Sequence, residues 1–338
     1  GVIEAPVMAP WVAARYPQIK SYKLIDAVNG RVVGRLSSSP TGLRAVLRTE
    51  KGRVYNDPRD ATLQDQTYVS RSRRSEPASA FSCGVHGNQV RDLGNWLDVR
   101  FKTAQRQEGV LLRYDLAVAV TLEYYNLQAA RFPMMLPDAA VMSAINDTIT
   151  RVNEIYERDL GITLQLVSGD ELFEKSNQGL NNDDAVALLA EVKDWIDARI
   201  ADGVNGYDIG HMFSAPPPPG AGIAFLGAVC NDSIKAGGVT GLPNPFDDPF
   251  DIDYVAHEIG HQFDAEHSFN GTVALNCRGN RNPSTAFEPG SGSSIMSYAG
   301  ICAGENLQSG ADVSFHLSLI HISEPTRPNA PSRMPSSA

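Results

Sequence analysis

The sequence lacks long hydrophobic runs, and no apolar stretch among its 338 residues is long enough to cross a bilayer. This excludes a transmembrane helix, which needs about 20 consecutive apolar residues. The chain has only four cysteines, which excludes a disulfide scaffold but fits an exported enzyme with one or two bridges. Lys and Arg number 29 against 39 Asp and Glu, and the net charge of −10 argues against a nucleic-acid-binding surface.

The length predicts two domains, and a hydrophobic content of 42% is enough for a sizeable core. The first hundred residues predict a small β-rich domain, because short strand-like runs alternate there with Gly, Pro and Asp. These runs are Tyr22–Ala27, Gly30–Leu36, Leu43–Arg48 and Gly52–Tyr55. The basic run Arg71–Arg74 follows. It is predicted to be a solvated loop, with a processing site as the alternative.

One segment predicts chemistry. Residues 257–267 read HEIGHQFDAEH, an H-E-x-x-H pattern with a third histidine six residues later. Residues four apart on a helix share a face, so His257 and His261 can bind one zinc ion, with Glu258 close to it. His267 adds a third neutral imidazole and leaves one zinc position open, as in catalytic sites. Zinc lowers the pKa of a bound water to about 7, so the segment predicts zinc-assisted peptide hydrolysis. The alternative is a helix with two surface histidines and an acid between them.

The wider context of this segment resembles a known family. Ser294–Tyr298 reads SIMSY, and together with the histidines it resembles the metzincin zinc proteases, whose H-E-x-x-H-x-x-G-x-x-H motif precedes a methionine turn. HEIGHQFDAEHSFNG at 257–271 and AGIC at 299–302 are similar to the adamalysin, or reprolysin, branch in its bacterial secreted form. The resemblance covers residues 108–316 well and the first hundred residues more loosely.

The resemblance implies a role for each motif residue. Glu258 is the general base, Met296 lies beneath the metal, and the zinc ligands are His257, His261 and His267. The run Phe81–Val85, FSCGV, resembles the cysteine switch of adamalysin pro-regions, in which a thiolate takes the open zinc position and excludes water. Cys83 is therefore expected to keep the chain inactive as a zymogen, and an ordinary loop cysteine is the alternative.

Two residues depart from the family pattern. Asp264 stands where the family has a glycine that ends the helix in a left-handed conformation. Asp also adopts that conformation, at a cost of about 1 kcal/mol, so we expect the same turn. Tyr298 stands where adamalysins usually lack tyrosine. Its phenol can donate to the developing oxyanion as a transition-state stabiliser, or it can simply pack beside the methionine turn.

Periodicity predicts the elements that precede the motif. A first long strand is expected within 107–128, centred on Leu111–Leu122. Apolar residues three and four apart predict helices over Asp138–Asp159 and Asp183–Ile200, the second capped by one of Asn181, Asn182 and Asp183. Further strands are expected at Ile162–Val167, Tyr207–Phe213 and Gly222–Cys230, with the zinc helix over Phe250–Phe263. This order predicts an α+β (α/β-like) domain with a twisted, mostly parallel sheet and a zinc helix.

The resemblance implies the same fold and divides the chain. Residues 1–106 are expected to be the β-rich pro-region, and 107–316 the metzincin catalytic domain. Gly222–Val229 is then the antiparallel edge strand that holds an extended substrate through its backbone. The expected contact residues are Gly222, Ile223, Ala224, Phe225, Leu226 and Gly227.

With Cys83 assigned to zinc, three cysteines remain, an odd number for an exported protein. Cys277 and Cys302 bracket the loop from the third histidine to just past the methionine turn. A bridge across about 25 residues would add on the order of 3 kcal/mol. The resemblance implies a partner for Cys230 at the C-terminal end of the chain. We therefore expect a Cys277–Cys302 disulfide, with pairing of Cys230 to either one as the alternative.

Two further short groups of residues are candidate ligand sites. The acidic group Asp247, Asp248, Asp251 and Asp253 precedes the zinc helix. Charge complementarity with the helix N-terminus is the favoured interpretation, and a Ca²⁺ site is the alternative. The run Gly237–Gly241 is glycine-rich but lacks the lysine and the strand–helix context of a phosphate loop, so we reject phosphate binding.

The end of the chain has an unusual sequence. From Leu317 it reads LSLIHISEPTRPNAPSRMPSSA, which resembles the translation of a sequencing-library adapter in two consecutive stretches. We expect residues 317–338 not to be native and exclude them from the fold. A genuine Pro- and Ser-rich disordered tail is the alternative. The native catalytic domain would then be truncated near His316.

Together these observations predict a secreted, monomeric zinc endopeptidase made as a zymogen, with Zn²⁺ as cofactor and protein or peptide substrates. Neither nucleic-acid partners nor a membrane span are expected. The alternative is a catalytically silent zinc-binding adhesion or interaction module on the same fold. Glu258 argues against that alternative, because an inactive relative has no need of a carboxylate at this position.

Overall fold

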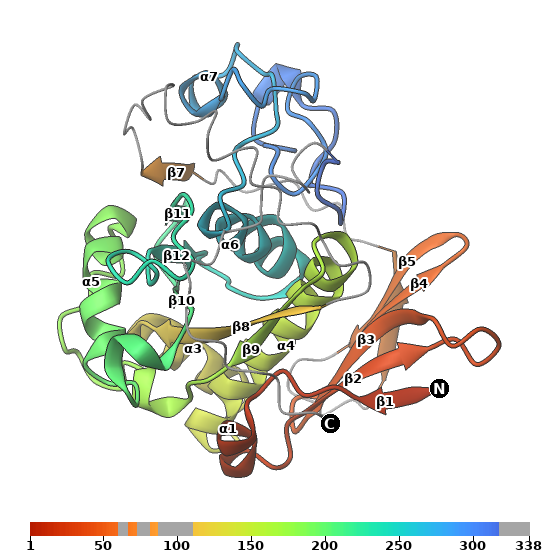
Figure 1. The fold of residues 1–338 in the computed structure, drawn as a ribbon, viewed down its shortest axis with the longest axis vertical. Coiled ribbons are helices and arrows are strands. Elements are labelled where there is room, and N and C mark those ends of the chain that lie inside the picture. The colour runs from red at the N-terminus through yellow and green to blue at the C-terminus, as the bar shows by residue number, and fades with distance from the viewer. Residues whose placement is uncertain (60–66, 73–81, 87–110, 318–338) are drawn as a thin grey trace.

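A computed structural model describes residues 1–59, 67–72, 82–86 and 111–317 of the chain (Figure 1). Several predictions fall partly or wholly outside these residues, including Phe81 of the cysteine-switch run and the start of the strand expected within 107–128. Others are the end of the basic run Arg71–Arg74, the domain boundary at 106–107 and nearly all of the proposed non-native tail.

The N-terminal residues form a six-stranded antiparallel sheet whose strands follow sequence order. The predicted β-rich region is therefore confirmed, and the four predicted strands correspond to β2–β5. Helix α1 (Pro10–Arg15) and the two outer strands were not predicted. The strands are β1 (Val2–Glu4), β2 (Lys20–Ile25), β3 (Val32–Ser39), β4 (Gly42–Thr49), β5 (Gly52–Pro58) and β6 (Tyr68–Arg71).

The second sheet is mixed but mostly parallel, as predicted, with the order β7-β11-β12-β10-β8-β9. Its antiparallel pair is β11 with β12, and the other four neighbouring pairs are parallel. The predicted first strand is shorter than expected, because α3 begins at Leu122. The strands are β7 (Ser82–His86), β8 (Leu112–Val120), β9 (Ile162–Leu166), β10 (Ile209–Ser214), β11 (Ala221–Phe225) and β12 (Gly238–Gly241).

Strand β12 is the glycine-rich run, and sequence analysis missed it as a strand. Its glycines are explained by close packing. A Cβ on Gly238 would lie 2.4 Å from both Gln262 Oε1 and His211 Nδ1, and a Cβ on Gly241 would lie 2.2 Å from Ser214 Oγ. The glycines of this run therefore allow the sheet to pack closely against the zinc helix.

Strand β11 is not at the edge of the sheet, which contradicts the prediction for Gly222–Val229. It lies between β12 and β7, and β7 pairs with it in parallel from Ser82 to His86. The strand also ends at Phe225, and Gly227 lies in a turn with φ +62°. The sequence pattern could not reveal this, because the covering strand comes from the N-terminal part of the chain.

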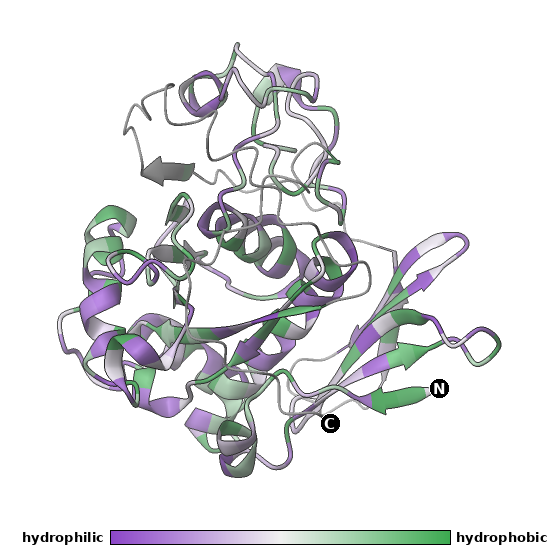
Figure 2. Cartoon of the chain, viewed as in Figure 1, coloured by the Kyte–Doolittle hydropathy of each residue, from purple (hydrophilic) through white to green (hydrophobic). Residues whose placement is uncertain are grey.

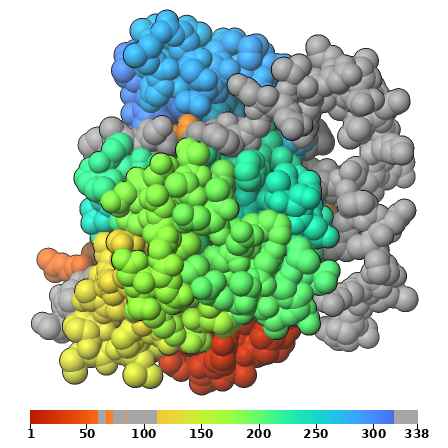
Figure 3. Space-filling view, turned by 90° about the vertical axis from the view of Figure 1, so that its left-hand side faces the viewer, coloured from red at the N-terminus to blue at the C-terminus, as the bar shows by residue number. Residues whose placement is uncertain are grey.

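The helices surround the second sheet, and each carries both hydrophobic and hydrophilic residues (Figure 2). In Figure 3 the green residues around α5 lie at the front, with the red N-terminal residues at the lower end and the blue residues before 318 at the upper end. None of the described helices is long and apolar enough to cross a membrane. The helices are α3 (Leu122–Arg131), α4 (Pro137–Asp159), α5 (Ala185–Asp197), the π-helical η3 (Pro249–Val255), α6 (Ala256–Gln262) and α7 (Leu275–Asn280), with short 3₁₀ turns η1 (Asp170–Leu172), η2 (Gly203–Gly206) and η4 (Ala303–Glu305).

Helix α5 shows how local chemistry sets an element boundary. Its N-cap is Asp184, whose carboxylate accepts from the N–H groups of Val186 and Ala187 at 2.9 and 3.1 Å. The predicted caps were one to three residues too early. Asn182 instead bonds to the Thr121 hydroxyl and the Ala215 carbonyl, so it joins loops rather than starting the helix.

Helix α4 is buried on both sides. Its predicted apolar positions face the core and are Val141, Ile145, Ile149, Val152 and Ile155. Its polar side packs against the N-terminal sheet, where basic side chains of that sheet meet acids of the helix. Asp147 bonds to Arg44 Nε at 3.0 Å, Glu157 pairs with Arg35, and Glu154 lies 3.2 Å from Arg48 Nε.

Arg151 of α4 lies at the centre of this polar interface and is 4% exposed. It donates to Asp57 of the N-terminal sheet, to Asp248 at 3.1 Å and to Asp251 at 3.0 Å. Arg71 of β6 closes a ring by donating to Asp248 at 2.7 Å and to Asp57 at 2.9 Å. The nearby acids hold the pKa of Arg151 well above its usual value, although burial opposes them.

These contacts correct two predictions. Asp248 and Asp251 bind buried arginines, so charge complementarity with the helix N-terminus does not describe their main interactions, and the Ca²⁺ alternative finds no support. Asp253 instead accepts from the Ala311 N–H at 2.9 Å. Arg71 is also an interface residue rather than part of a solvated loop.

Replacing Arg151 with Met should lower the free energy of unfolding by about 3–5 kcal/mol, because it leaves buried carboxylates without their cation. Urea denaturation followed by circular dichroism measures the change. Arg113→Met is the matched control, because the Arg113 side chain is 61% exposed and its removal should cost at most about 0.5 kcal/mol. Equal urea midpoints for the two variants would show that the ring contributes little.

Candidate metal centre

The candidate metal centre begins on α6, the helix that follows the π-helical segment η3. His257 and His261 lie one turn apart on this helix, and both are buried. Gly260 between them allows close packing, because a Cβ there would lie 2.6 Å from Met296 Sδ. The methionine turn therefore packs directly against the zinc helix at Gly260, whereas the resemblance places Met296 beneath the metal.

The third histidine reaches the site through the turn at Asp264. The backbone of Asp264 has φ +72°, and its N–H donates to the His261 carbonyl at 2.8 Å. The left-handed conformation predicted for this residue is thus confirmed. It ends the helix and returns the chain so that His267 faces the other two imidazoles.

The three imidazoles converge through their Nε2 atoms. His261 Nε2 lies 3.1 Å from the Nε2 atoms of His257 and His267, and these two lie 3.3 Å apart. Each Nδ1 has a backbone carbonyl partner instead. The carbonyls are Ile295 for His257 at 2.6 Å, Ala265 for His261 at 2.7 Å and Asn280 for His267 at 2.8 Å. A carbonyl can only accept, so each Nδ1 carries the proton and each Nε2 has a lone pair for a metal.

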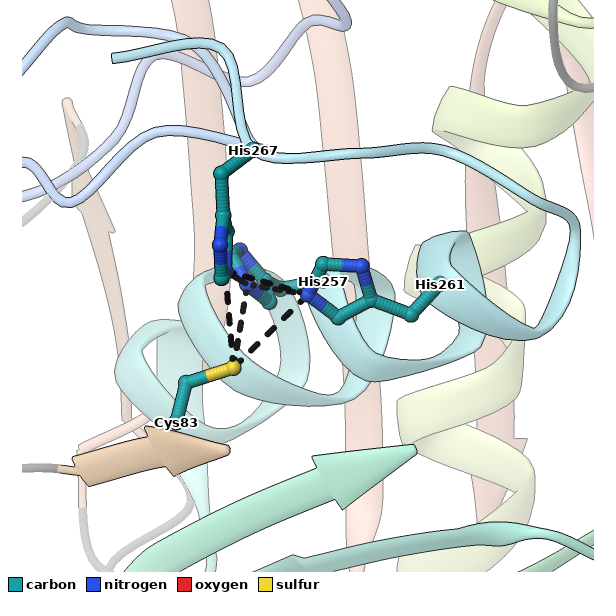
Figure 4. A group of neighbouring side chains, drawn as sticks. All are labelled: Cys83, His257, His261 and His267. Carbon is teal, nitrogen blue, oxygen red and sulfur yellow. Dashed lines mark hydrogen bonds between the residues drawn. The ribbon is translucent and has the colours of Figure 1, made fainter. Parts of the chain in front are cut away.

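The fourth donor is Cys83 of β7 (Figure 4). Its Sγ lies 3.5, 3.7 and 3.6 Å from the Nε2 atoms of His257, His261 and His267. Ideal zinc–nitrogen and zinc–sulfur distances of about 2.0–2.1 and about 2.3 Å give tetrahedral separations of about 3.3 Å between nitrogens and about 3.6 Å from nitrogen to sulfur. The donor atoms therefore fit a tetrahedral zinc ion.

The charge states of these groups also fit a metal. Burial lowers the pKa of His257 to about 4, and burial with the neighbouring imidazoles holds the pKa values of His261 and His267 well below their usual value. All three are therefore neutral at pH 7. Burial and Glu258 raise the pKa of the Cys83 thiol, and a divalent cation reverses this because it deprotonates a coordinating thiol.

Glu258 lies beside this cluster and is fully buried. Neither of its carboxylate oxygens has a hydrogen-bond partner among the described residues. Burial raises its pKa to about 8, and the neighbouring Cys83 thiol opposes the rise. A divalent cation held by the cluster would favour the ionised carboxylate and lower this pKa again. A buried carboxyl group with no partner is costly to keep unless function requires it.

Tyr298 is also buried at the cluster. Its ring stacks on Phe269 with centroids 4.3 Å apart and meets the edge of His267 at 4.7 Å. Its hydroxyl donates to the backbone carbonyl of Cys83 at 2.9 Å. The packing role is therefore present, and the hydroxyl binds the backbone of β7 beside the cluster.

Sequence analysis missed two buried groups that support the site. Gln262 is the last residue of α6. Its Nε2 donates to the Gly210 carbonyl at 2.8 Å, and its Oε1 lies 2.8 Å from His211 Nδ1. Glu288 accepts from Ser268, which follows the third histidine, and from Ser293 and Ser294, which lead into the methionine turn. Burial raises the pKa of Glu288, but these donors outweigh it and hold the pKa below its usual value. No local pattern marks either residue, because the partners of Gln262 and the Ser268 partner of Glu288 are distant in sequence and the nearer serines of Glu288 lie in an irregular loop.

The cysteines match the predicted arrangement. Cys277 and Cys302 form a disulfide, with Cα atoms 5.6 Å apart. Cys230 is not in a disulfide within the described residues, and its thiol lies 3.9 Å from Asp208 Oδ1. The bridge joins α7 to the chain just after the methionine turn, so it encloses the loop that contains Glu288.

Substitutions at Asp264 should follow the ease with which each residue adopts a left-handed backbone. Asp264→Gly should retain stability and zinc content, whereas Asp264→Val should lose about 2 kcal/mol and bind zinc more weakly, because β-branched residues are strained there. Urea midpoints and zinc content measured by atomic absorption check this. If Val is tolerated as well as Gly, the turn does not set the position of His267.

Comparison with known proteins agrees with the site. The sequence model described as Metallo-peptidase family M12B Reprolysin-like matches residues 113–323, which include the whole motif and more than half of the chain. No curated protein matches the chain. Peptidases of this family use zinc and act on proteins, in agreement with the donor set. The chain belongs to the reprolysin-like metallopeptidases of family M12B.

Proposed function

We propose that this protein is a secreted zinc endopeptidase, made as an inactive precursor whose N-terminal segment blocks the metal site. The observation that carries the proposal is the cluster of four potential metal-ligand atoms, which all lie within 4.8 Å of one another. Three come from the H-E-x-x-H segment and its extension, and the fourth is Cys83 of the N-terminal segment. Glu258, with no other partner among the described residues, lies beside them.

In this proposal His257, His261 and His267 hold the metal and Glu258 moves protons. A zinc ion bound there would supply Lewis-acid chemistry, since it would polarise a peptide carbonyl and lower the pKa of a water molecule to about 7. The Glu258 carboxylate takes a proton from the attacking water and later delivers it to the leaving amine. The carbonyl partners of the three Nδ1 atoms fix the tautomer and the orientation of the imidazoles, while burial keeps the imidazoles neutral.

The N-terminal segment would inhibit the enzyme in two ways. Cys83 supplies a ligand where a catalytic site needs an open position. Strand β7 also pairs with Ala221–Phe225 of β11, so an extended substrate cannot add to that strand. Removal of β7 would free the backbone of β11 for a peptide and release the Tyr298 hydroxyl from the Cys83 carbonyl.

The proposed location is outside the cytoplasm, and we infer that the enzyme works there as a monomer on peptide substrates. The Cys277–Cys302 disulfide supports export. Structural disulfides persist in oxidising compartments and are rare in the cytosol. The bridge lies beside the metal centre, where loss of the covalent link would loosen the loop around the methionine turn.

Cys83→Ala should raise the peptidase activity of the uncleaved chain on casein by about tenfold or more. The substitution removes the ligand that closes the metal site, and a ligand interaction of only about 1.4 kcal/mol already shifts the equilibrium between the closed and the open site tenfold. Cys230→Ala is the matched control, since Cys230 lies outside the metal cluster. Zinc content is measured in parallel. Equal latency of the Cys83→Ala and wild-type chains would refute the blocking role of Cys83.

Glu258→Gln, made in the Cys83→Ala chain, should lower peptide cleavage by at least about 10²-fold while zinc stays bound, because the general base is lost but every histidine remains. Glu123→Gln on the exposed start of α3 serves as the control. Cleavage near the parent rate would show the assigned mechanism to be wrong. A parent chain that binds zinc and still cleaves nothing after limited proteolysis has removed its N-terminal segment would instead favour the silent binding module.

A further inference from the structure

The side chain of Glu288 connects the two backbone segments that position two of the histidines. It is 6% exposed and lies in the loop between His267 and the methionine turn. Its Oε1 accepts from the hydroxyls of Ser268 and Ser294, and its Oε2 accepts from the N–H groups of Ser293 at 2.7 Å and Ser294 at 2.9 Å. Four donors thus meet one buried carboxylate.

One side of this carboxylate holds the residue after His267. The Ser268 hydroxyl donates to it, and the backbones of residues 268 and 288 are joined as well, with the Glu288 N–H donating to the Ser268 carbonyl at 2.9 Å. His267 lies outside the helix, so helical geometry does not set the position of its imidazole. The contacts of Ser268 and the bond from Thr285 Oγ1 to the His267 carbonyl at 2.7 Å do so instead.

The other side holds the residues before Ile295. The Ile295 carbonyl accepts the Nδ1 proton of His257 at 2.6 Å, so its position sets the orientation of that ring. Ser293 and Ser294 lead into this carbonyl and both donate to Glu288. Ser268 and Met296 are also joined, with the Ser268 N–H donating to the Met296 carbonyl at 3.0 Å.

The backbone around Glu288 is shaped to fit the side chain. Gly292 has φ +66°, and a Cβ there would lie 2.6 Å from Ser297 Cβ and 3.1 Å from Glu288 Oε2. Hydrogen bonds to an ionised acceptor are about twice as strong as neutral ones, so this carboxylate can hold a tight turn that would otherwise leave buried N–H groups unsatisfied.

We propose that Glu288 is a positioning residue that fixes the imidazoles of His257 and His267 relative to each other and thereby sets how tightly the chain holds zinc. The proposal rests on the zinc site of the proposed function but not on peptide cleavage. Residues that orient metal ligands through hydrogen bonds typically cost 10–100-fold in metal affinity when they are replaced. A purely structural Glu288 would instead lower stability and leave the affinity of the folded chain unchanged.

The test measures the zinc dissociation constant of the full chain by competition with a chelating dye, at a temperature where each variant is folded. Glu288→Ala should weaken zinc binding about 10–100-fold. Glu288→Gln should lose less than about tenfold, because its amide can donate to the two serine hydroxyls while its oxygen accepts from both N–H groups. Rescue by the Gln variant identifies the hydrogen-bond pattern, rather than side-chain bulk, as the cause.

A second readout reports the ligand geometry directly. The visible absorption bands of the Co²⁺-substituted chain should shift in Glu288→Ala and remain near wild type in Glu288→Gln. Val12→Ala is the stability control, because Val12 is fully buried in α1, which belongs to the N-terminal part of the chain. This control should lower the urea midpoint and leave both the zinc affinity and the Co²⁺ spectrum unchanged.

Serine variants keep the proposal testable if Glu288→Ala fails to fold. The double variant Ser268→Ala and Ser294→Ala removes both hydroxyl donors but keeps the carboxylate and both N–H groups, so it should weaken zinc binding several-fold. Unchanged zinc affinity and an unchanged Co²⁺ spectrum in the foldable variants would overturn the role of Glu288. A wild-type chain that binds no zinc would overturn the proposed function as well, whereas zinc effects without peptide cleavage would leave this inference intact.

Discussion

Three backbone carbonyls that fix three imidazoles are the constraint on which the metal centre depends. Each carbonyl belongs to a different segment, namely the methionine turn at Ile295, the helix exit at Ala265 and the end of α7 at Asn280. The Nε2 atoms converge to within 3.1–3.3 Å only while these segments hold their places. The left-handed turn at Asp264, the Cys277–Cys302 bridge and the Glu288 contacts all act on those segments, so they support the centre without touching the metal position.

The sequence predicted the centre well because its information there is local. Helical spacing places His257 and His261 on one face, and a left-handed residue at 264 follows from the need to return His267 to them. The strands of the N-terminal sheet were likewise evident from short runs separated by Gly, Pro and Asp, and the apolar side of α4 from its helical period. In each case the signal lies within one element, where neighbouring residues report on a shared face.

The features that the sequence did not reveal depend on pairs of distant residues. Strand β12 was hidden because its glycines reflect the closeness of Gln262 and His211 rather than a strand propensity. The edge position of β11 was wrong because β7, from far upstream, pairs with it. The acids before the zinc helix were assigned to a helix end because nothing local indicates that Arg151 lies a hundred residues earlier in the chain and within 3.0 Å of Asp251.

The chemistry of α4 suits a chain of two separable parts. Its apolar side faces the second sheet, and its polar side meets the N-terminal sheet mainly through ion pairs such as Asp147–Arg44 and Glu157–Arg35. A buried ion pair gains little net free energy, because the cost of desolvation offsets the attraction. Separation of such an interface returns charges to water, but it also uncovers apolar contacts, because Val7, Val12 and Ile19 of the N-terminal part are buried in the common core. The proposed loss of the N-terminal segment would therefore separate the ion pairs at little net cost, and its main cost would be the exposure of the apolar contacts made by Val7, Val12 and Ile19.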